Sequence, residues 1–563
     1  MFKRLIPVII AVALIIVIGG VGFFTILLPR YSYSKETMDL AEYYGLTAPD
    51  EVAIILQDEV IETRAYLKQG VYYMDLESVQ NLLNHRFYED KAEQLLIFTT
   101  PTQIIRTVIG SNTYLQGEQE IVKDYPLSFY DNGVLYLALD YVHEFTNFHY
   151  EAFTDPYRIQ LNTEWSEAEM AEISRNTAVR YRGGIKSDIL RQLAKGEQVT
   201  VLEELENWSE IKTNDGIIGY VENKRLKNKA TVTETPAAHY EEPEYTSIVR
   251  DYKINLGWHQ VGAKIGNSTL EDVLAGTQAL NVISPTWFSL SDNEGGIRSF
   301  AEQGYVDRVH GLGMEVWALV DNFDTNVSSY EVLSRTTSRT RLIENLMNEV
   351  LQYGIDGINV DFEDLSYEEG EPFIQFMREL SIQCRLHGIV LSSDNYVPRA
   401  STTHYDRKEQ GVVADYVIIM GYDEHWGGGG IAGSVASIGF VEDGIAQTVE
   451  EVPPHKVINA LPFYTRVWKT QDGKVTSEAV AMEVAQSFVA NNGVEVGWDA
   501  ETCQNYGEKQ LGNAFYQVWL EDAQSIETKL TIMKKYDLGG VAAWKLGLET
   551  DDIWNLIAAY TNS

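Results

Sequence analysis

The chain has 563 residues, with 82 Asp or Glu against 44 Lys or Arg, so its formal net charge is −38. Nucleic-acid-binding proteins present a basic surface, and this acidic balance therefore argues against DNA or RNA as a partner. The length leaves room for more than one domain. Two cysteines, Cys384 and Cys503, are too few for a disulfide framework, and the sequence leaves open whether they form one bond or stay as buried thiols.

The first predicted element is a membrane-spanning helix. Residues 5–28 form an uncharged apolar run of about 24 residues, which is long enough to cross a bilayer. Lys3 and Arg4 precede the run and favour a cytoplasmic N-terminus, with everything from about residue 31 outside the cell. A secretory signal peptide is the alternative, but the apolar run is long and no small-x-small cleavage site stands at its end, directly before Pro29. We expect residues 1–30 to be a cytoplasmic tip and transmembrane anchor, with secretion after cleavage as the rival outcome.

Residues 35–172 are expected to form an α+β domain. The stretches 70–75 (GVYYMD) and 132–142 (NGVLYLALDYV) look like paired hairpin-and-helix units. They resemble the small α+β domain found in the N-terminal region of copper amine oxidases, which also occurs in secreted proteins without copper. This resemblance implies a fold only, and we transfer no functional residue from it.

Residues 174–228 predict a small all-β barrel. Short alternating strands are separated by Lys195-Gly196 and Asp215-Gly216, which are favourable turn pairs. The pattern is similar to bacterial SH3 domains of cell-wall enzymes, and this resemblance implies a tether to peptidoglycan, with a plain spacer as the alternative. Residues 229–247, with prolines and several Glu, are expected to be an extended linker.

Residues 248–563 alternate between strand-like and helix-like segments. Helical spacing occurs in most of the intervals between apolar strand-like runs, for example at Leu342, Leu346 and Val350. Eight such units predict a closed (β/α)8 barrel of parallel strands, with an insertion at about 465–518. The eight expected strands are 253–259, 280–287, 314–320, 355–363, 389–395, 415–422, 456–462 and 539–546.

The fourth of these strands carries an unusual set of acids. In the run DGINVDFE, at 356–363, apolar residues alternate with Asn359, Asp361 and Glu363, so these three polar side chains share one face at steps of roughly 6 to 7 Å. Acids on one face raise each other's pKa, and a general acid needs such a rise to stay protonated near neutral pH. Glu363 stands at the carboxyl end of its strand, where barrel enzymes carry their chemistry.

This run resembles the D-G-x-D-x-D-x-E motif of glycoside hydrolase family 18. Asp356, Gly357, Asp361 and Glu363 match it, while Asn359 replaces an Asp and removes one charge from the acid group. The sixth-strand run 420–423 (MGYD) and Ala543-Trp544 in the last strand are also similar to family motifs. The third strand lacks the Ser-x-Gly-Gly of typical chitinases, and together with Asn359 it favours the branch of spore-cortex and cell-wall N-acetylglucosaminidases.

The resemblance implies a role for each matching residue. Glu363 would protonate the glycosidic oxygen, while the N-acetyl group of the substrate attacks the anomeric carbon. Asp361 would accept the acetamido N–H, Tyr422 would donate a hydrogen bond to the same group and Trp544 would stack under the sugar. Further contacts to substrate are expected from the remaining candidates, namely Asp356 and Asn359 as supporting groups and Asp423, Asn395 and Asp321 near strand ends. No cofactor or metal is expected, because the histidines lack metal-ligand spacing.

Two functional classes follow from these expectations. The first is a membrane-anchored, extracytoplasmic glycoside hydrolase acting next to N-acetylglucosamine, with peptidoglycan favoured over chitin. The second is a non-catalytic carbohydrate-binding or wall-tethering protein on the same barrel. Retention of both Asp361 and Glu363 favours the enzyme. The sequence leaves open the oligomeric state and whether cleavage is internal or from a chain end.

Overall fold

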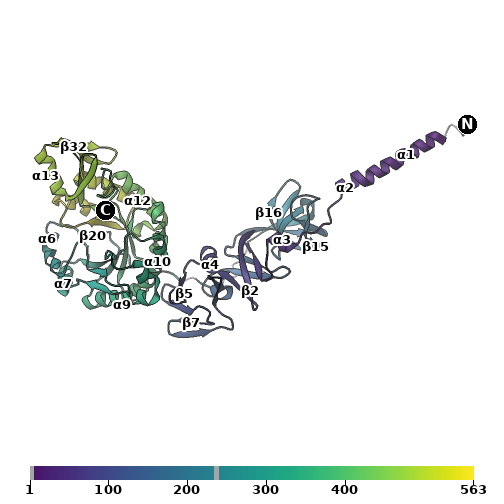
Figure 1. Cartoon of the computed structure of the whole chain (residues 1–563), viewed down its shortest axis with the longest axis horizontal. Coiled ribbons are helices and arrows are strands. Elements are labelled where there is room, and N and C mark those ends of the chain that lie inside the picture. Colours follow the sequence, from purple (N-terminus) through teal and green to yellow (C-terminus); the bar gives the residue numbers. More distant parts are fainter. Residues whose placement is uncertain (1–5, 234–239, 242, 563) are drawn as a thin grey trace. The chain divides into compact units, whose positions relative to one another are not determined.

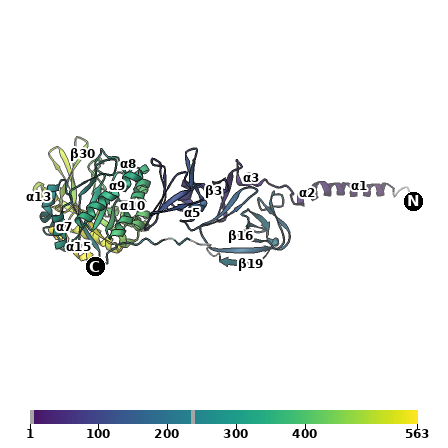
Figure 2. The same ribbon diagram turned by 90° about the horizontal axis from the view of Figure 1, so that it is seen from below.

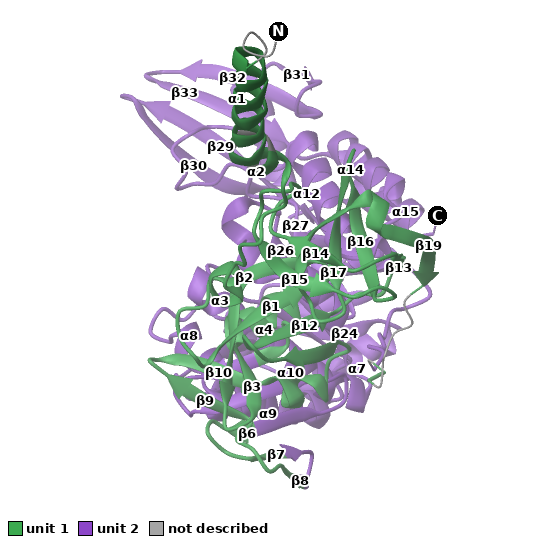
Figure 3. Cartoon of the chain, turned by 90° about the vertical axis from the view of Figure 1, so that its right-hand side faces the viewer, with its two compact units in different colours: residues 1–87, 107–114, 120–242 green, residues 88–106, 115–119, 243–563 purple. Residues whose placement is uncertain are grey.

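The computed structural model describes residues 6–233, 240–241 and 243–562 and contains two compact units (Figure 3). The first unit holds residues up to 87 together with 107–114 and 120–242. The second holds 88–106, 115–119 and the chain from 243 onward. Lys3, Arg4 and linker residues 234–239 and 242 lie outside the described residues. Both cysteines are free thiols, with Cys384 buried and Cys503 partly exposed.

The N-terminal apolar run is helical. It comprises α1 (Ile6–Gly22), the π-helical turn η2 (Phe23–Leu27) and α2 (Leu28–Tyr31). Residues Ile6–Thr25 form one helix that is long and apolar enough to cross a membrane, and none of it is buried. Water is a poor solvent for an exposed helix that has no polar face. The helix is therefore consistent with either a membrane anchor or a signal peptide.

A mixed seven-stranded sheet, ordered β11-β12-β1-β2-β3-β10-β9, forms the first part of unit one. The strands β3 and β10 pair in antiparallel fashion, and each leads directly into a short helix. Asp75 caps the first of these helices by accepting a hydrogen bond from the Ser78 amide at 2.9 Å. The bounds are β1 (Glu51–Leu56), β2 (Glu59–Lys68), β3 (Val71–Asp75), α4 (Leu76–Leu82), β9 (Ser128–Asp131), β10 (Val134–Ala138), α5 (Leu139–His143), β11 (His149–Phe153) and β12 (Arg158–Asn162).

A second seven-stranded sheet, ordered β15-β14-β18-β17-β16-β13-β19, completes unit one and confirms the predicted all-β module. All of its pairings are antiparallel, and its inward residues, such as Val179, Val199 and Ile211, are fully buried. The bounds are β13 (Glu167–Ile173), β14 (Thr177–Arg180), β15 (Ile189–Leu193), β16 (Gln198–Glu204), β17 (Trp208–Thr213), β18 (Ile218–Glu222) and β19 (Leu226–Thr233).

Unit two is built on a closed barrel of eight parallel strands, as the sequence predicts (Figures 1 and 2). The first strand, β20, pairs with both β21 and β34, and β21 also pairs with β24, so the sheet closes on itself. The strands are β20 (Ile254–His259), β21 (Val282–Pro285), β24 (Glu315–Asp321), β25 (Gly357–Asp361), β26 (Val390–Tyr396), β27 (Tyr416–Met420), β28 (Val457–Pro462) and β34 (Gly540–Trp544).

Helices surround the barrel strands on the outside (Figure 1). The longest, α9 and α10, flank the acidic strand β25 in the sequence, and a Ser366–Glu369 capping box starts α10. The main helices are α7 (Gln303–Gly311), α9 (Thr336–Tyr353), α10 (Tyr367–His387), α11 (Arg407–Val413), α12 (Ile438–Glu451), α14 (Ala523–Lys535) and α15 (Trp554–Thr561).

The inside of the barrel is filled by side chains. Trp317 and Tyr416 lie there with ring centroids 5.4 Å apart, and both are fully buried. A Cβ atom on Gly357 would lie 2.6 Å from Cδ1 of Trp317. The glycine of the DGINVDFE run is therefore required by the close approach of Trp317 from the neighbouring strand.

Two further segments belong to unit two. Between β28 and α14 the chain forms a five-stranded antiparallel sheet, ordered β30-β29-β33-β32-β31, with one helix. Residues 88–106 pack on the outer helices, where the Asp90 carboxylate accepts two hydrogen bonds of 2.6 Å from Thr336 at the start of α9. The bounds are β29 (Tyr464–Gln471), β30 (Lys474–Ala481), α13 (Met482–Asn492), β31 (Val496–Asp499), β32 (Gln504–Leu511) and β33 (Ala514–Leu520).

Candidate active site

A pocket of about 210 Å³ opens at the carboxyl ends of the barrel strands. Its lining side chains come from or follow β20, β24, β25, β26, β27 and β34, so residues far apart in sequence converge there. The lining consists of Trp258, Phe323, Asp361, Glu363, Asp394, Tyr396, Met420, Tyr422, Asp423 and Trp544. Aromatic walls around several carboxyl groups suit a ligand with apolar ring faces and polar edges.

Glu363 follows β25 and is held from two sides. The Tyr396 hydroxyl donates a hydrogen bond of 2.6 Å to Oε2 of Glu363. The Asn322 side chain, just after β24, donates to the Glu363 carbonyl and accepts from its amide, both at 2.9 Å. Burial raises the pKa of Glu363, and the charges of nearby aspartates add to the rise, while the hydrogen bond from Tyr396 opposes it. A carboxyl group in this environment can stay protonated and donate its proton to a ligand.

Asp361 is the last residue of β25 and is only 5% exposed. Burial raises its pKa well above the usual range, and the charges of Asp394, Glu363 and Asp321 raise it further. Its Oδ1 atom is buried and has no hydrogen-bond partner among the described residues. A buried acceptor without a donor is costly, so this oxygen requires a proton donor from a neighbouring group.

Asn359 lies one layer below and connects four strands. Its Oδ1 accepts hydrogen bonds from Trp258 Nε1 at 2.9 Å and from the Ser284 hydroxyl at 3.2 Å. Its Nδ2 donates to Ser392 Oγ at 3.1 Å and to Asp394 Oδ1 at 2.8 Å. The side chain is fully buried and supports the pocket floor without lining it.

Strand β26 contributes Asp394, which the sequence patterns did not indicate. Asp394 and Tyr396 both point into the pocket, whereas the predicted Asn395 points away and exchanges hydrogen bonds of 2.7 and 3.0 Å with Gln410 on α11. The alternation of side chains along a strand could have revealed this difference, because Ser392, Asp394 and Tyr396 share one face.

Tyr422, Asp423 and Trp544 form the opposite side of the pocket, as their positions after β27 and at the end of β34 predict. Burial raises the pKa of Tyr422 well above its usual value, so its hydroxyl remains a donor. Asp423 accepts a hydrogen bond of 2.7 Å from the Tyr464 hydroxyl. The rings of Trp544 and Trp258 lie 5.9 Å apart, giving the pocket an indole wall.

Like Asn359 and Asn395, two further predicted residues, Asp356 and Asp321, lie outside the pocket lining. Asp356 precedes β25 at the amino end of the strand, where it accepts a hydrogen bond of 2.8 Å from the Val316 amide and bonds His310 at the same distance. Asp321 is buried at the end of β24 and accepts from Ser289 and from the Phe323 amide at 3.0 and 3.1 Å. Asp356 thus braces the other end of the barrel, whereas Asp321 holds the backbone of the pocket residue Phe323 and raises the pKa of Asp361 through its charge.

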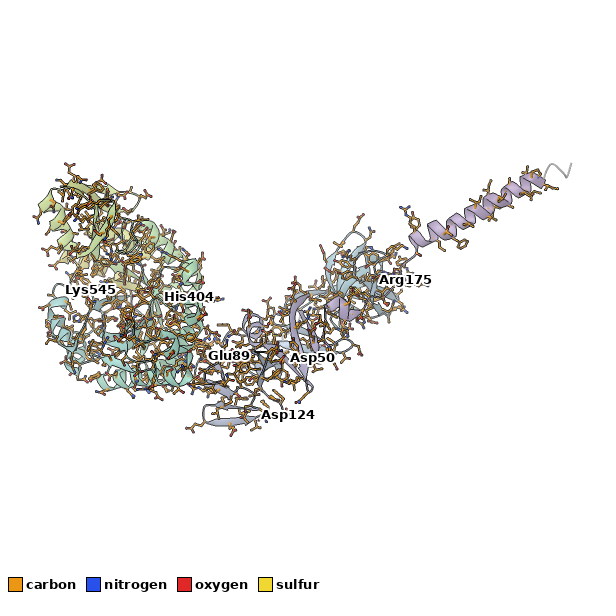
Figure 4. The ribbon with its side chains drawn as sticks, viewed as in Figure 1. Asp50, Glu89, Asp124, Arg175, His404 and Lys545 are labelled. Carbon is orange, nitrogen blue, oxygen red and sulfur yellow. The ribbon has the colours of Figure 1, made fainter. Side chains whose placement is uncertain are left out.

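The surroundings of the pocket provide no metal centre within the described part of the chain, where no group of three His, Cys, Asp or Glu is placed to hold an ion. His404 and Lys545, labelled in Figure 4, follow β26 and β34. His404 Nε2 bonds the Leu365 carbonyl at 2.8 Å, and Lys545 donates to Gln260. Both side chains are therefore engaged in protein contacts.

Comparison with known proteins identifies two domains. The family described as "Glycosyl hydrolases family 18" matches residues 320–549, which include every pocket residue except Trp258, and "Bacterial SH3 domain" matches residues 175–227. The "Cortical fragment-lytic enzyme" of Bacillus anthracis is 27% identical over 246 residues, covering 42% of this chain and 56% of that protein. The protein of the same name in Bacillus cereus is 26% identical over 306 residues, covering 51% of this chain and 70% of that protein.

Among solved structures, a chitinase from Chromobacterium violaceum aligns with a TM-score of 0.50 and 23% identity. The alignment covers 55% of this chain and 99% of that chain, and it supports the barrel fold. The first of the curated relatives is matched over little more than half of its length. The predicted similarity of residues 35–172 to copper amine oxidases stays a prediction.

Proposed function

Because the chain carries a family 18 glycosyl hydrolase domain and a bacterial SH3 domain, we propose that it cleaves β-1,4 bonds next to N-acetylglucosamine in peptidoglycan or chitin-like polymers. One observation carries this proposal. The pocket brings together Glu363, whose raised pKa favours the proton-donor form, and Asp361, whose Oδ1 lacks a donor. The cortical fragment-lytic relatives favour peptidoglycan as the substrate.

The proposed mechanism uses the N-acetyl group of the substrate as the nucleophile. Glu363 gives its proton to the glycosidic oxygen as the bond between that oxygen and the anomeric carbon breaks. The acetamido carbonyl oxygen forms a new bond to the anomeric carbon and produces an oxazolinium ion. Water then attacks this carbon as its bond to the acetamido oxygen breaks, and the water gives a proton to the Glu363 carboxylate. The two successive displacements retain the configuration at the anomeric carbon.

The other pocket residues orient and stabilise the reacting group. Asp361, which lines the pocket, accepts the acetamido N–H on its carboxylate and stabilises the positive charge that develops there. Tyr422 donates a hydrogen bond to the acetamido group, and Trp544 stacks under the apolar face of the sugar. Asp423 binds a sugar hydroxyl beside them.

We further propose that α1 anchors the enzyme in the membrane with the bulk of the chain outside, and that the SH3 module binds the cell wall. The exposed apolar surface of α1 supports the first part. The second part rests on the family of the module alone. Both would keep the barrel close to its polymer substrate despite the net charge of −38, which disfavours tight contact with anionic wall polymers.

The test is hydrolysis by the purified full chain in detergent. Glu363→Gln keeps the shape of the side chain but removes the acidic proton that it would donate. We therefore expect kcat on peptidoglycan to fall at least about 10³-fold. Glu368→Gln, an exposed change five residues further on, is the matched control and should retain wild-type activity. Product masses should show N-acetylglucosamine at the new reducing ends. If the wild type binds peptidoglycan or chitin but cleaves neither, the barrel is a binding module and the hydrolase proposal fails.

A further inference from the structure

We propose that Asp394 is a positioning residue that shares one proton with Asp361 and donates it as a hydrogen bond to the Asp361 carboxylate. The proposal rests on the proposed hydrolase function, in which Asp361 must be ionised to accept the acetamido N–H. Asp394 lies on β26, outside the acidic run of β25, and no family motif quoted above includes it.

The two carboxyl groups lie side by side on adjacent strands. In the parallel pairing of β25 with β26, Val360 is opposite Ser393, and the next step along both strands brings Asp361 beside Asp394. Neighbouring strands are about 4.8 Å apart, so the two side chains are in reach of each other when they share a face. Both do share the inner face, because both line the pocket, and they are only 5% and 3% exposed.

The Asn359 amide determines which oxygen of Asp394 can carry the proton. The indole nitrogen of Trp258 can only donate, so the Asn359 atom that it contacts must be the carbonyl oxygen. The Asn359 amino group then points to Oδ1 of Asp394, at 2.8 Å, and makes that oxygen an acceptor. Oδ2 of Asp394 is thus left to carry the proton, and the buried Oδ1 of Asp361, which has no partner among the described residues, is the oxygen that lacks a donor.

The charge balance of the site requires such a shared proton. Burial raises the pKa of both aspartates well above the usual range; the hydrogen bond from Asn359 opposes the rise at Asp394, and the charge of Asp394 raises the pKa of Asp361 further. Two adjacent buried carboxylates repel each other when both are ionised, so the pair favours a state in which one proton is kept. Asn359 stands where the family motif has a third acid, and it adds a donor without adding charge. When the substrate N–H reaches Asp361, the one remaining proton lies on Asp394.

The pH dependence of kcat for Asp394→Asn in the full chain tests this arrangement. An amide N–H is a weaker donor to a carboxylate than a carboxyl O–H, so ionised Asp361 is less stabilised in the variant. The acid limb of the profile should therefore move to higher pH, by about one unit. An unmoved limb overturns the proposal. So does a downward shift, which would mean that Asp394 is ionised beside Asp361 and that its removal relieves repulsion.

Asp415→Asn is the matched control at the opposite end of the barrel. Asp415 is 3% exposed and accepts hydrogen bonds of 2.6 and 2.8 Å from the amides of Ile248 and Leu391. Its substitution should lower stability without moving the acid limb. A shift of equal size in both variants would mean that Asp394 acts only through structure.

A measurement without turnover separates this proposal from the hydrolase proposal. Infrared spectra of the resting protein at pH 7 should contain the carbonyl stretch of a protonated carboxyl that is missing in Asp394→Asn. If the band disappears but the wild type cleaves no polymer, the shared proton stands and the hydrolase function fails. If the wild type is active and Asp394→Asn changes neither the infrared band nor the acid limb, the hydrolase function stands and the proposal of a shared proton fails.

Discussion

The protonation state of Glu363 is a balance between its burial and one hydroxyl group. Burial and neighbouring negative charges raise its pKa, whereas the short hydrogen bond from Tyr396 favours the ionised form. The same hydroxyl also lies 3.3 Å from Asp364. Tyr396 is thus the group on which the alkaline side of the pH profile depends.

Removing this hydroxyl should shift that side of the profile in a defined direction. In Tyr396→Phe the ionised form of Glu363 loses a donor, so Glu363 stays protonated to higher pH, and the alkaline limb of kcat should move up by about one unit. At the optimum we expect less than a tenfold loss of kcat. Tyr367→Phe, at a side chain that is 80% exposed, is the control and should leave the profile unchanged. A downward shift would contradict the role given to Tyr396.

At the scale of single residues, sequence patterns predicted several of the pocket residues but not the contacts between residues on neighbouring strands. Period-two alternation predicted that Asp361 and Glu363 share a face, and both line the pocket, although their roles stay predictions. Asp394 was missed because its significance depends on the register between β25 and β26, which the sequence of either strand alone does not reveal. Asp356 directly precedes β25, so it lies at the amino end of this strand, at the opposite end of the barrel from the pocket.

At the level of elements, a buried ion pair joins α9 and α10, the two helices on either side of the acidic strand. Arg339 and Glu379 are 0% and 1% exposed, and their side chains meet at 2.8 Å. Arg339 also lies over the ring of Tyr88, from the segment that packs outside these helices. Each charge in this contact depends on the other, because water does not reach either of them.

Arg339→Met should therefore destabilise unit two by about 3–5 kcal/mol, since it leaves the Glu379 charge without a partner. Adding Glu379→Leu removes that charge and should restore most of the loss. The measurement is denaturant unfolding followed by tryptophan fluorescence. Arg341→Met, on the same helix and paired at the surface with Glu294 and Asp292, is the control and should change stability by less than about 1 kcal/mol. An additive loss in the double variant would contradict this account.

The eight barrel strands and the SH3 module were predictable because their apolar periodicity and turn residues are local signals. The packing of residues 88–106 on α9 and α10 was not. The contacts between Asp90 and Thr336 join positions 246 residues apart, and nothing near Asp90 in the sequence indicates its partner. The strand order of the antiparallel sheet between β28 and α14 was also not predictable. This part of the sequence has no helical periodicity from which the order of its strands could be inferred.

For the whole molecule, the first question is whether α1 remains attached. If it is an anchor, the full chain should stay in the membrane fraction after alkaline carbonate washing and be released by detergent. The double variant Ile15→Lys, Ile16→Lys places two charges at exposed positions of the helix and should release the protein. Recovery of a soluble wild-type chain whose N-terminus lies beyond residue 25 would identify a cleaved signal peptide instead.

The hydrogen bond from Trp258 to Asn359 has a further consequence for the site. An asparagine amide is nearly symmetric in shape, so packing alone would allow it to rotate by half a turn and exchange its oxygen and nitrogen. The indole N–H, which has no acceptor capacity, prevents that rotation at a distance of 2.9 Å. Trp258, on the first barrel strand, thereby fixes the orientation of the Asn359 amide on the fourth strand. Through that amide it also determines which oxygen of Asp394, on the fifth strand, is open to a proton.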